Sequence, residues 1–172
     1  DGVSIIGGTE YSGHFSIGSD LGLLAGIGEK GVFVVENIED ALKDCDVIID
    51  FTTPGSSIKT LNAAVSYEKS IVIGTTGFSA EQKKIINQAA EKIRCVFAPN
   101  MSVGVNVLFK IAEDVSKALG DAYDVEIVEA HHKFKKDAPS GTAVRLSEII
   151  ADSLDRDIDQ VGVYGRQGMA ER

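Results

Sequence analysis

Strand-like and helix-like runs alternate along this chain of 172 residues, and the alternation limits its possible folds more than any other feature. Short apolar runs bounded by turn residues indicate strands, whereas apolar residues spaced three or four positions apart indicate helices. The expected strands cover residues 3–8, 46–51, 70–73, 95–98 and 125–130. The expected helices cover residues 37–43, 56–67 and 103–119, and a further helix begins at Ser79. This pattern predicts an α/β fold with a largely parallel sheet.

Residues 46–51 form an almost continuous apolar run. Such a run is expected where helices cover both faces of a sheet, so we expect this strand to be central. Residues 51–53, 74–76 and 98–101 each follow an expected strand. Ligands of open parallel sheets bind beyond the carboxyl ends of the strands. The convergence of these three loops therefore predicts a dinucleotide site.

Four consecutive residues in the second half of the chain predict a helix start that can bind an anion. Pro139 cannot continue a helix from the preceding turn, and Ser140 is a good N-cap. Gly141 and Thr142 then fall in a first turn whose amides have no partner within the helix. Free amides at a helix N-terminus bind anions, so this turn is a candidate site for a carboxylate.

Titratable side chains lie directly ahead of this turn. A pocket formed by the turn, Lys135 and either His131 or His132 would hold a small carboxylate and could pass it a proton. Adjacent side chains of an extended strand point to opposite faces, so the two histidines are not expected to share a metal ion. The segment therefore predicts acid chemistry on an anionic metabolite, with no metal.

The formal net charge of −9 argues against a general nucleic-acid binder and against a protein that binds anionic membranes. No stretch is long and apolar enough to span a bilayer, and the first residues do not resemble a secretory signal peptide. Cys45 and Cys95 lie far apart in apolar runs, which is typical of reduced thiols in a reducing compartment. We expect a soluble, cytoplasmic protein with no nucleic-acid or membrane partner.

Four motifs together cover much of the chain. They are Asp-Phe-Thr at residues 50–52, Gly-Thr-Thr-Gly-Phe at 74–78, Ala-Pro-Asn-Met-Ser-Val-Gly-Val-Asn at 98–106 and the pattern His-His-x-x-Lys-x-Asp-Ala-Pro-Ser-Gly-Thr-Ala at 131–143. In this order they resemble the motifs of the 4-hydroxy-tetrahydrodipicolinate reductase (dihydrodipicolinate reductase) family, and the last pattern is long enough to be highly specific. The resemblance implies a Rossmann-like parallel-sheet dinucleotide-binding domain over residues 1–101. It also implies an α+β domain for substrate binding and oligomerisation over residues 102–172.

The same resemblance implies an enzyme that uses NADH or NADPH to reduce 4-hydroxy-tetrahydrodipicolinate, with loss of water, to tetrahydrodipicolinate. This reaction belongs to the diaminopimelate route to lysine. His131 would be the proton donor or acceptor, and Lys135 would be the second catalytic group. The residues implied to bind the small dicarboxylate substrate are His132, Ser140, Gly141 and Thr142. The residues implied to bind the cofactor are Glu10, Phe51, Gly74, Thr75, Thr76, Ala98, Pro99, Asn100 and Met101.

Both ends of the chain are expected to be incomplete. A dinucleotide-binding domain normally begins with a strand and a Gly-x-Gly-x-x-Gly turn, followed about 20 residues later by an acidic residue that binds the ribose. Glu10 suits that role and would place the glycine turn before Asp1. Residues 161–164 have the pattern of a strand with no partner of its own. Family members continue with further strands and assemble mainly as tetramers through this sheet, so a homotetramer is expected of the intact protein.

Coenzyme choice is expected to depend on the residue after Glu10. Many family members have an arginine there, which can pair with the 2′-phosphate of NADPH, whereas this chain has Tyr11. Thr53 supplies no charge where some relatives have a second arginine. Glu10 can accept a hydrogen bond from a ribose 2′-hydroxyl but would repel a 2′-phosphate. NADH is therefore expected to be preferred over NADPH.

Two alternatives to a working enzyme follow from the same fold. One is a dinucleotide-binding sensor without turnover, and the other is a fragment that is inactive because its glycine turn and last strands are missing. His131 and Lys135 are intact, which favours an enzyme over a sensor. Their presence does not exclude an inactive fragment.

Overall fold

The computed structural model describes residues 2–169, which divide into two compact units. The first unit ends at Phe97 and the second begins at Ala98. The outer limits of the two predicted domains, residue 1 and residue 172, lie outside the described residues. The predicted boundary after residue 101 stays a prediction.

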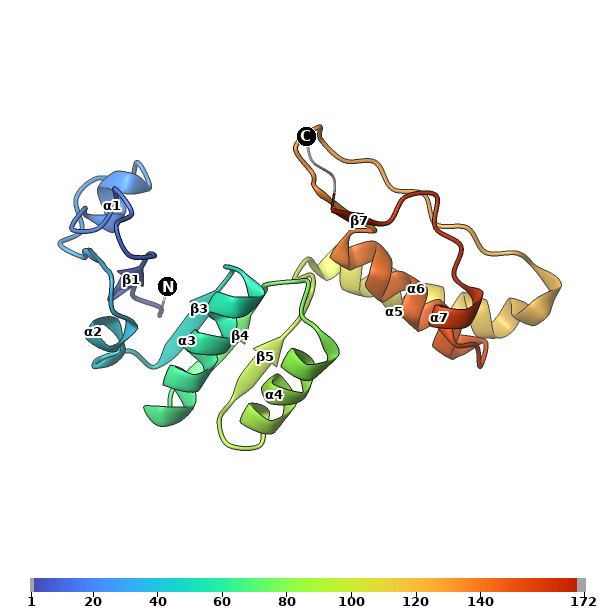
Figure 1. Ribbon diagram of the computed structural model, residues 1–172, viewed down its shortest axis with the longest axis horizontal. Coiled ribbons are helices and arrows are strands. Elements are labelled where there is room, and N and C mark those ends of the chain that lie inside the picture. The colour runs from blue at the N-terminus through green and yellow to red at the C-terminus, as the bar shows by residue number, and fades with distance from the viewer. Residues whose placement is uncertain (1, 170–172) are drawn as a thin grey trace. The chain divides into compact units, whose positions relative to one another are not determined.

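The first unit contains a three-stranded parallel sheet. Its strands are β3 (Val47–Asp50), β4 (Ser70–Ile73) and β5 (Cys95–Phe97), in the order β3-β4-β5. Helices α3 (Pro54–Ser66) and α4 (Ala80–Ala90) connect these strands, and both lie on the same face of the sheet (Figure 1). The α/β class is thus confirmed, and the sequence placed the strand at residues 70–73 without error.

A hydrophobic core fills the space between this sheet and its two helices. Leu61 of α3, Ile71 and Ile73 of β4 and Ile86 of α4 are each at most 1% exposed. Alternate residues of β4 point to one face, so the two isoleucines share the side that the helices cover. Ser79 begins α4 with the predicted capping box, because its hydroxyl accepts from the amide of Gln82 and the Gln82 side chain accepts from the Ser79 amide.

The expectation that residues 46–51 form a central strand covered on both faces is wrong for the described residues. Strand β3 is an edge of the three-stranded sheet, and β4 is its centre. Val47 and Ile49 are 43% and 66% exposed, on the face opposite α3 and α4. The run is apolar because both faces carry apolar side chains, but only one face is packed in this part of the chain.

The N-terminal part of the first unit has little regular structure. Strand β1 (Gly8–Thr9) pairs in parallel with β2 (Val34–Val35), and the chain between them contains helix α1 (Leu21–Leu24). The predicted strand over residues 3–8 is therefore mostly wrong, since only Gly8 belongs to a strand. The buried carboxylate of Asp20 organises the glycine-rich segment by accepting hydrogen bonds from the amides of Gly22, Leu23, Lys30 and Gly31. Helix α2 (Ile38–Leu42) begins after Asn37, close to the predicted bounds.

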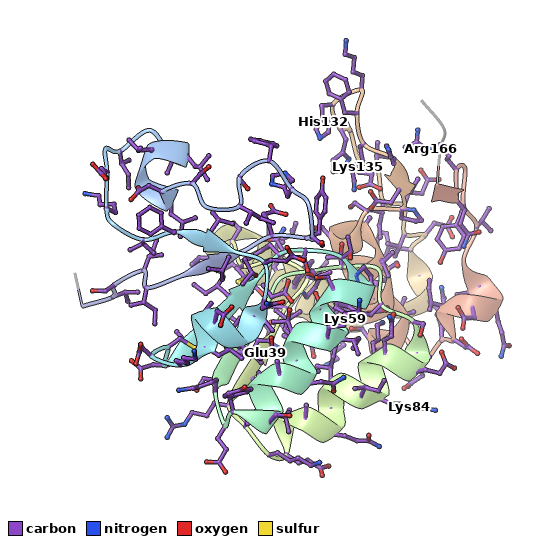
Figure 2. All side chains as sticks on the ribbon, turned by 60° about the vertical axis from the view of Figure 1, so that its left-hand side comes forward. Glu39, Lys59, Lys84, His132, Lys135 and Arg166 are labelled. Carbon is purple, nitrogen blue, oxygen red and sulfur yellow. The ribbon has the colours of Figure 1, made fainter. Side chains whose placement is uncertain are left out.

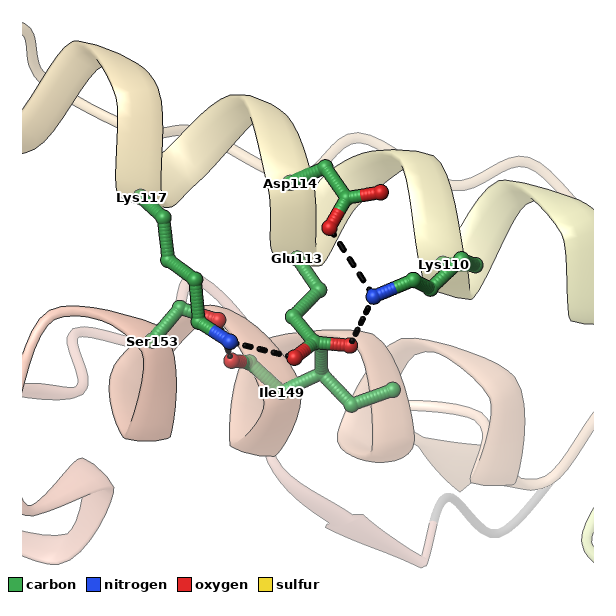
Figure 3. Close-up of polar contacts among 6 residues, drawn as sticks. All are labelled: Lys110, Glu113, Asp114, Lys117, Ile149 and Ser153. Carbon is green, nitrogen blue, oxygen red and sulfur yellow. Dashed lines mark hydrogen bonds and ion pairs between the residues drawn. The ribbon is translucent and has the colours of Figure 1, made fainter.

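The second unit is built on two long helices that pack together, α5 (Val103–Leu119) and α6 (Gly141–Ser153). Helix α5 has the predicted bounds and ends at Gly120, whose φ of 59° lies in the left-handed region. A chain of ion pairs runs along α5 through Lys110, Glu113, Asp114 and Lys117, beside Ile149 and Ser153 of α6 (Figure 3). These pairs are solvent-exposed and contribute little to stability.

Shorter elements complete this unit: the 3₁₀ turn η1 (Gly120–Ala122), helix α7 (Ile158–Val161) and the antiparallel pair β6 (Asp137–Ala138) and β7 (Gly168–Met169). The predicted strand over residues 125–130 is wrong, because this segment is irregular, with Val128 91% exposed. The predicted strand over residues 161–164 is also wrong, because Val161 ends α7 and Gly162 caps it. The alternating and apolar patterns were present, but no neighbouring strand pairs with either segment within residues 2–169.

Cys45 is buried and Cys95 is partly buried, and both are free thiols. Burial raises the pKa of each thiol, which disfavours the reactive thiolate. No helix within residues 2–169 has the length and apolar character needed to cross a membrane.

Candidate active site

The second unit contains a cavity of about 960 Å³ between the segment that precedes α6 and the segment that follows it. His131, His132 and Lys135 all line this cavity. Figure 2 shows His132 and Lys135 on the same loop, which leads into β6. The structure therefore brings together the three side chains that the sequence singled out for acid chemistry.

Lys135 is the most buried of these three groups and has a fixed partner. Its Nζ lies 2.6 Å from Oδ1 of Asp137, and the Lys135 side chain is only 19% exposed. The ammonium group of Lys135 and, further away, the charge of His131 hold the pKa of Asp137 below its ordinary value against the opposing effect of burial. Asp137 belongs to β6, whose pairing with β7 fixes its backbone. The lysine is thus held by a carboxylate that stays ionised.

Glu129 links the histidine segment to the start of α6. One carboxylate oxygen, Oε2, lies 3.5 Å from Nδ1 of His131. The other, Oε1, accepts a hydrogen bond of 2.8 Å from the backbone amide of Ser140. Burial acts to raise the pKa of Glu129, but hydrogen bonds from Ser140 and the charges of His131 and Lys135 outweigh it and lower that pKa. Two carboxylates, Glu129 and Asp137, thus lie beside the basic side chains of His131 and Lys135 at the cavity wall.

Helix α6 begins as the sequence predicts. The Ser140 hydroxyl accepts from the amide of Ala143 at 3.1 Å, which is the N-cap interaction, and Ser140 is buried. Gly141 and Thr142 occupy the first turn. The Thr142 hydroxyl accepts a hydrogen bond of 3.1 Å from the side-chain amide of Asn100 and keeps its own proton for another acceptor. Pro139 and Ala143 line the cavity, whereas the three residues between them are not among its lining residues.

A buried polar network lies at the carboxyl ends of β3 and β4 in the first unit. Thr75 is 4% exposed, and its hydroxyl oxygen accepts from the amide of Thr52 at 2.8 Å and from the hydroxyl of Ser57 at 2.9 Å. Oδ1 of Asp50 accepts from the amide and hydroxyl of Thr52, at 3.0 and 2.7 Å. The Thr75 side chain therefore holds the two strand ends together, while the neighbouring Thr76 is exposed.

Phe51 and Gly74 are in close contact at the same strand ends. A Cβ atom added to Gly74 would lie only 2.0 Å from the nearest ring carbon of Phe51, so no larger residue fits there without moving the ring. The Phe51 side chain is nevertheless 62% exposed. The glycine thus allows an aromatic ring to lie against the backbone with much of its surface open to a ligand.

The remaining predicted cofactor residues lie after β1 and after β5. Glu10 directly follows β1, its amide donates to the carbonyl of Val35 in β2, and its carboxylate accepts from the amide of Tyr11. Ala98, Pro99, Asn100 and Met101 follow β5 in the chain and belong to the second unit. Asn100 is held by several hydrogen bonds, including one of 2.8 Å from the amide of Ser102 to its side-chain oxygen.

Sequence reasoning missed the acidic partners of the site. Glu129 and Asp137 lie within two residues of His131 and Lys135, and this regular spacing of acidic and basic side chains is the signal that could have identified them. Residues 26–31 also have Gly-x-Gly-x-x-Gly spacing. They connect α1 to β2 and so run from a helix to a strand, whereas the phosphate-binding turn runs from a strand to a helix.

Comparisons with known proteins agree over nearly the whole chain. Residues 1–101 match the family model described as dihydrodipicolinate reductase, N-terminus, and residues 104–170 match the model of its C-terminus. The chain is 52% identical over 168 residues to 4-hydroxy-tetrahydrodipicolinate reductase of Geobacter sulfurreducens, and 52% identical over 169 residues to that of Geotalea daltonii. Each match covers 98% of this chain and 63% of the relative. The chain therefore spans less than two thirds of the length of these relatives.

A solved structure shows the same fold. The dipicolinate-bound dihydrodipicolinate reductase from Paenisporosarcina sp. TG-14 matches with a TM-score of 0.61 and 29% sequence identity. The match covers 87% of this chain and 56% of that one.

Proposed function

The chain belongs to the dihydrodipicolinate reductase family, and from this we propose that it acts in the NAD(P)H-dependent reduction of 4-hydroxy-tetrahydrodipicolinate to tetrahydrodipicolinate. The reaction is a step of the diaminopimelate route to lysine. The observation that carries the proposal is that His131 and Lys135 line the same cavity, each beside an ionised carboxylate. That arrangement suits proton delivery to an anionic ring.

His131 is proposed to transfer the proton, with the Lys135 ammonium group as the second catalytic group. Lys135 is held by Asp137, so its charge stays at a fixed place in the cavity wall. A positive charge placed in advance stabilises negative charge that develops on a substrate without the cost of reorganising water. His132 lines the same cavity and is proposed to contact the substrate.

Substrate carboxylates are proposed to bind at the first turn of α6. The amides of Gly141 and Thr142 and the free proton of the Thr142 hydroxyl are the donors, next to the N-cap residue Ser140. The dipicolinate bound by the Paenisporosarcina protein is a dicarboxylate, which makes this compound a stable probe for the proposed site.

Hydride for the reaction would come from a reduced nicotinamide cofactor, which supplies the redox chemistry. The exposed Phe51 ring beside Gly74 fits a planar ring, and Thr76 is exposed on the loop after β4. Because the hydroxyl of Thr75 is buried and engaged, Thr75 is proposed to contact the cofactor through its backbone alone. The other proposed cofactor residues are Glu10, Ala98, Pro99, Asn100 and Met101.

NADH is proposed as the preferred coenzyme, because Glu10 is followed by the uncharged Tyr11. A cytoplasmic location and a homotetramer are further proposals that rest on membership in the family. The proposed tetramer no longer has a strand at residues 161–164 as its basis, because that segment is irregular after α7. Static light scattering of the product of the complete gene tests the tetramer, and a monomeric mass would contradict it.

The decisive experiment measures the oxidation of NADH by the purified product of the complete gene, followed at the absorbance of the reduced coenzyme. Oxidation is expected only when 4-hydroxy-tetrahydrodipicolinate is generated in the cuvette. Dipicolinate should inhibit it by competing for the carboxylate site. Binding of NADH with no turnover of that substrate would overturn the proposal and favour the sensor hypothesis.

A further inference from the structure

The geometry points to Glu129 as a positioning residue that holds the proton-transfer histidine and the carboxylate-binding turn in a fixed relation to each other. This inference rests on the proposed function and adds a role that the family motifs do not assign. One side chain contacts both parts of the site: Oε2 lies 3.5 Å from Nδ1 of His131, and Oε1 accepts from the Ser140 amide at 2.8 Å.

The first contact acts through charge. At 3.5 Å the pair is at the limit of a hydrogen bond, so Glu129 acts on His131 mainly through its negative charge, which attracts the imidazole whenever the ring carries a second proton. The His131 and Glu129 side chains are 37% and 30% exposed, so water screens this attraction only in part. Among the other charged or titratable groups of the cavity, Lys135 and Asp137 pair with each other at 2.6 Å, and Asp124, Glu126, His132, Arg156 and Arg166 also line it. Among the described residues, Glu129 is the carboxylate that lies within ion-pair distance of the His131 ring.

The second contact acts through the backbone. The amide of the N-cap residue Ser140 points away from the helix and needs an acceptor of its own, which Glu129 supplies. Because Ser140 begins the turn that contains Gly141 and Thr142, its position sets where a bound carboxylate would lie. The segment between Glu129 and Ser140 has only one short strand, β6, so this hydrogen bond is an important restraint on the loop.

The two contacts can be separated by two substitutions. Glu129→Gln keeps an oxygen that can accept from the Ser140 amide but removes the charge. Glu129→Asp keeps the charge but is one methylene shorter and cannot span both groups. Asp152→Asn is the matched control, since Asp152 is an exposed residue of α6 outside the cavity lining.

For Glu129→Gln we expect kcat to fall about 10- to 100-fold, part of the 10²–10⁴-fold that general acid catalysis contributes, with KM nearly unchanged. The alkaline limb of the kcat profile should move to lower pH, because Glu129→Gln removes the negative charge that lies 3.5 Å from Nδ1 of His131. A purely structural role would not move that limb. Glu129→Asp should leave the limb near its wild-type position and raise KM several-fold, and Asp152→Asn should change neither quantity.

An NMR titration of the His131 ring in the same proteins does not depend on turnover. If the wild type is inactive, the proposed function fails, but a titration of His131 that moves to lower pH in Glu129→Gln still supports the positioning role. An identical titration in wild type and Glu129→Gln, or a Glu129→Gln enzyme whose loss lies entirely in KM, would overturn it.

Discussion

Thr75 and Thr76 are adjacent in sequence but are expected to respond in opposite ways to the same substitution. Thr75→Val removes a buried hydroxyl that accepts from the Thr52 amide at 2.8 Å and from the Ser57 hydroxyl at 2.9 Å and that donates to Oδ1 of Asp50 at 3.4 Å. Thr76 is exposed, and its hydroxyl has no hydrogen-bond partner among the described residues. Thr76→Val is therefore a matched control, because it makes the same replacement of a hydroxyl by a methyl group at an exposed position.

The expected magnitude follows from the partners that remain. Each hydrogen bond contributes about 0.5–1.5 kcal/mol, so the two shorter ones would cost about 1–3 kcal/mol, and the 3.4 Å bond to Asp50 adds little because it is long. The Thr52 amide keeps Oδ1 of Asp50 at 3.0 Å, and the Ser57 hydroxyl lies 3.4 Å from that of Thr52, so neither donor is left alone. We therefore expect a loss of about 1–2 kcal/mol in the free energy of unfolding for Thr75→Val, which lowers Tm by roughly 3–6 °C in a protein of this size. Thr76→Val should stay within about 0.5 kcal/mol of wild type.

Urea denaturation followed by circular dichroism measures the free energy of unfolding, and isothermal titration with NADH measures cofactor affinity in the same proteins. Thr75→Val should lose stability, with less than a threefold change in Kd at a temperature where it is folded. Thr76→Val should keep its stability, and its Kd should rise if its side chain contacts the cofactor. A Thr75→Val protein as stable as wild type, or an equal loss of stability in Thr76→Val, would refute the account of the buried network.

Further predictions concern catalysis, substrate binding, coenzyme choice and acid stability. His131→Gln and Lys135→Ala should each lower kcat by about 10²-fold or more with little change in the Kd for NADH, and near-normal turnover in both variants would remove these residues from the mechanism. Thr142→Val should raise KM for the dicarboxylate by about tenfold or more, since a hydrogen bond to a charged group contributes about 1.5–3 kcal/mol, and an unchanged KM in a folded variant would place the substrate elsewhere. The kcat/KM for NADH should exceed that for NADPH by about ten- to a hundredfold, the value of one charge-assisted contact, and this preference should be smaller in Tyr11→Arg. Equal values in the wild type would show that Tyr11 does not decide the choice. The pKa of Asp137 is held below its ordinary 3.8 in the folded state, so its ionisation contributes stability above that pH, and this contribution is lost as the pH falls further. The stability difference between wild type and Asp137→Asn, measured by urea denaturation from pH 6 to pH 2.5, should therefore shrink below about pH 4, and a constant difference would contradict the pairing with Lys135.

Local signals in the sequence predicted most of the elements. The capping box at Ser79, the N-cap at Ser140 and the stop at Gly120 depend on residues within one helical turn, and the structure contains all three. These features are predictable because the side chain that forms the contact lies next to the backbone group that it satisfies.

The errors concern partners that are distant in sequence. Whether residues 125–130 or residues 161–164 form a strand depends on a neighbouring strand, and period-2 or apolar patterns do not report one. Whether β3 lies at the edge or the centre of the sheet also depends on its neighbouring strands, and the residues of β3 alone do not report them. For the candidate site, the motif pointed to His131 and Lys135, but the geometry was needed to connect Glu129 with Ser140.

The hydrogen bond between Asn100 and Thr142 joins a proposed cofactor residue to a proposed substrate residue 42 positions later in the chain. If both assignments hold, the two ligands cannot bind independently, because each one restrains an end of the same hydrogen bond. A dicarboxylate that orders Thr142 then changes the affinity of the dinucleotide by a given factor, and the dinucleotide must change the affinity of the dicarboxylate by the same factor. The order in which two ligands bind is usually attributed to one bound ligand blocking access for the other. In this protein the order would also depend on a coupling energy transmitted through one side-chain amide. Replacing that amide with the methyl group of alanine should make the two affinities independent.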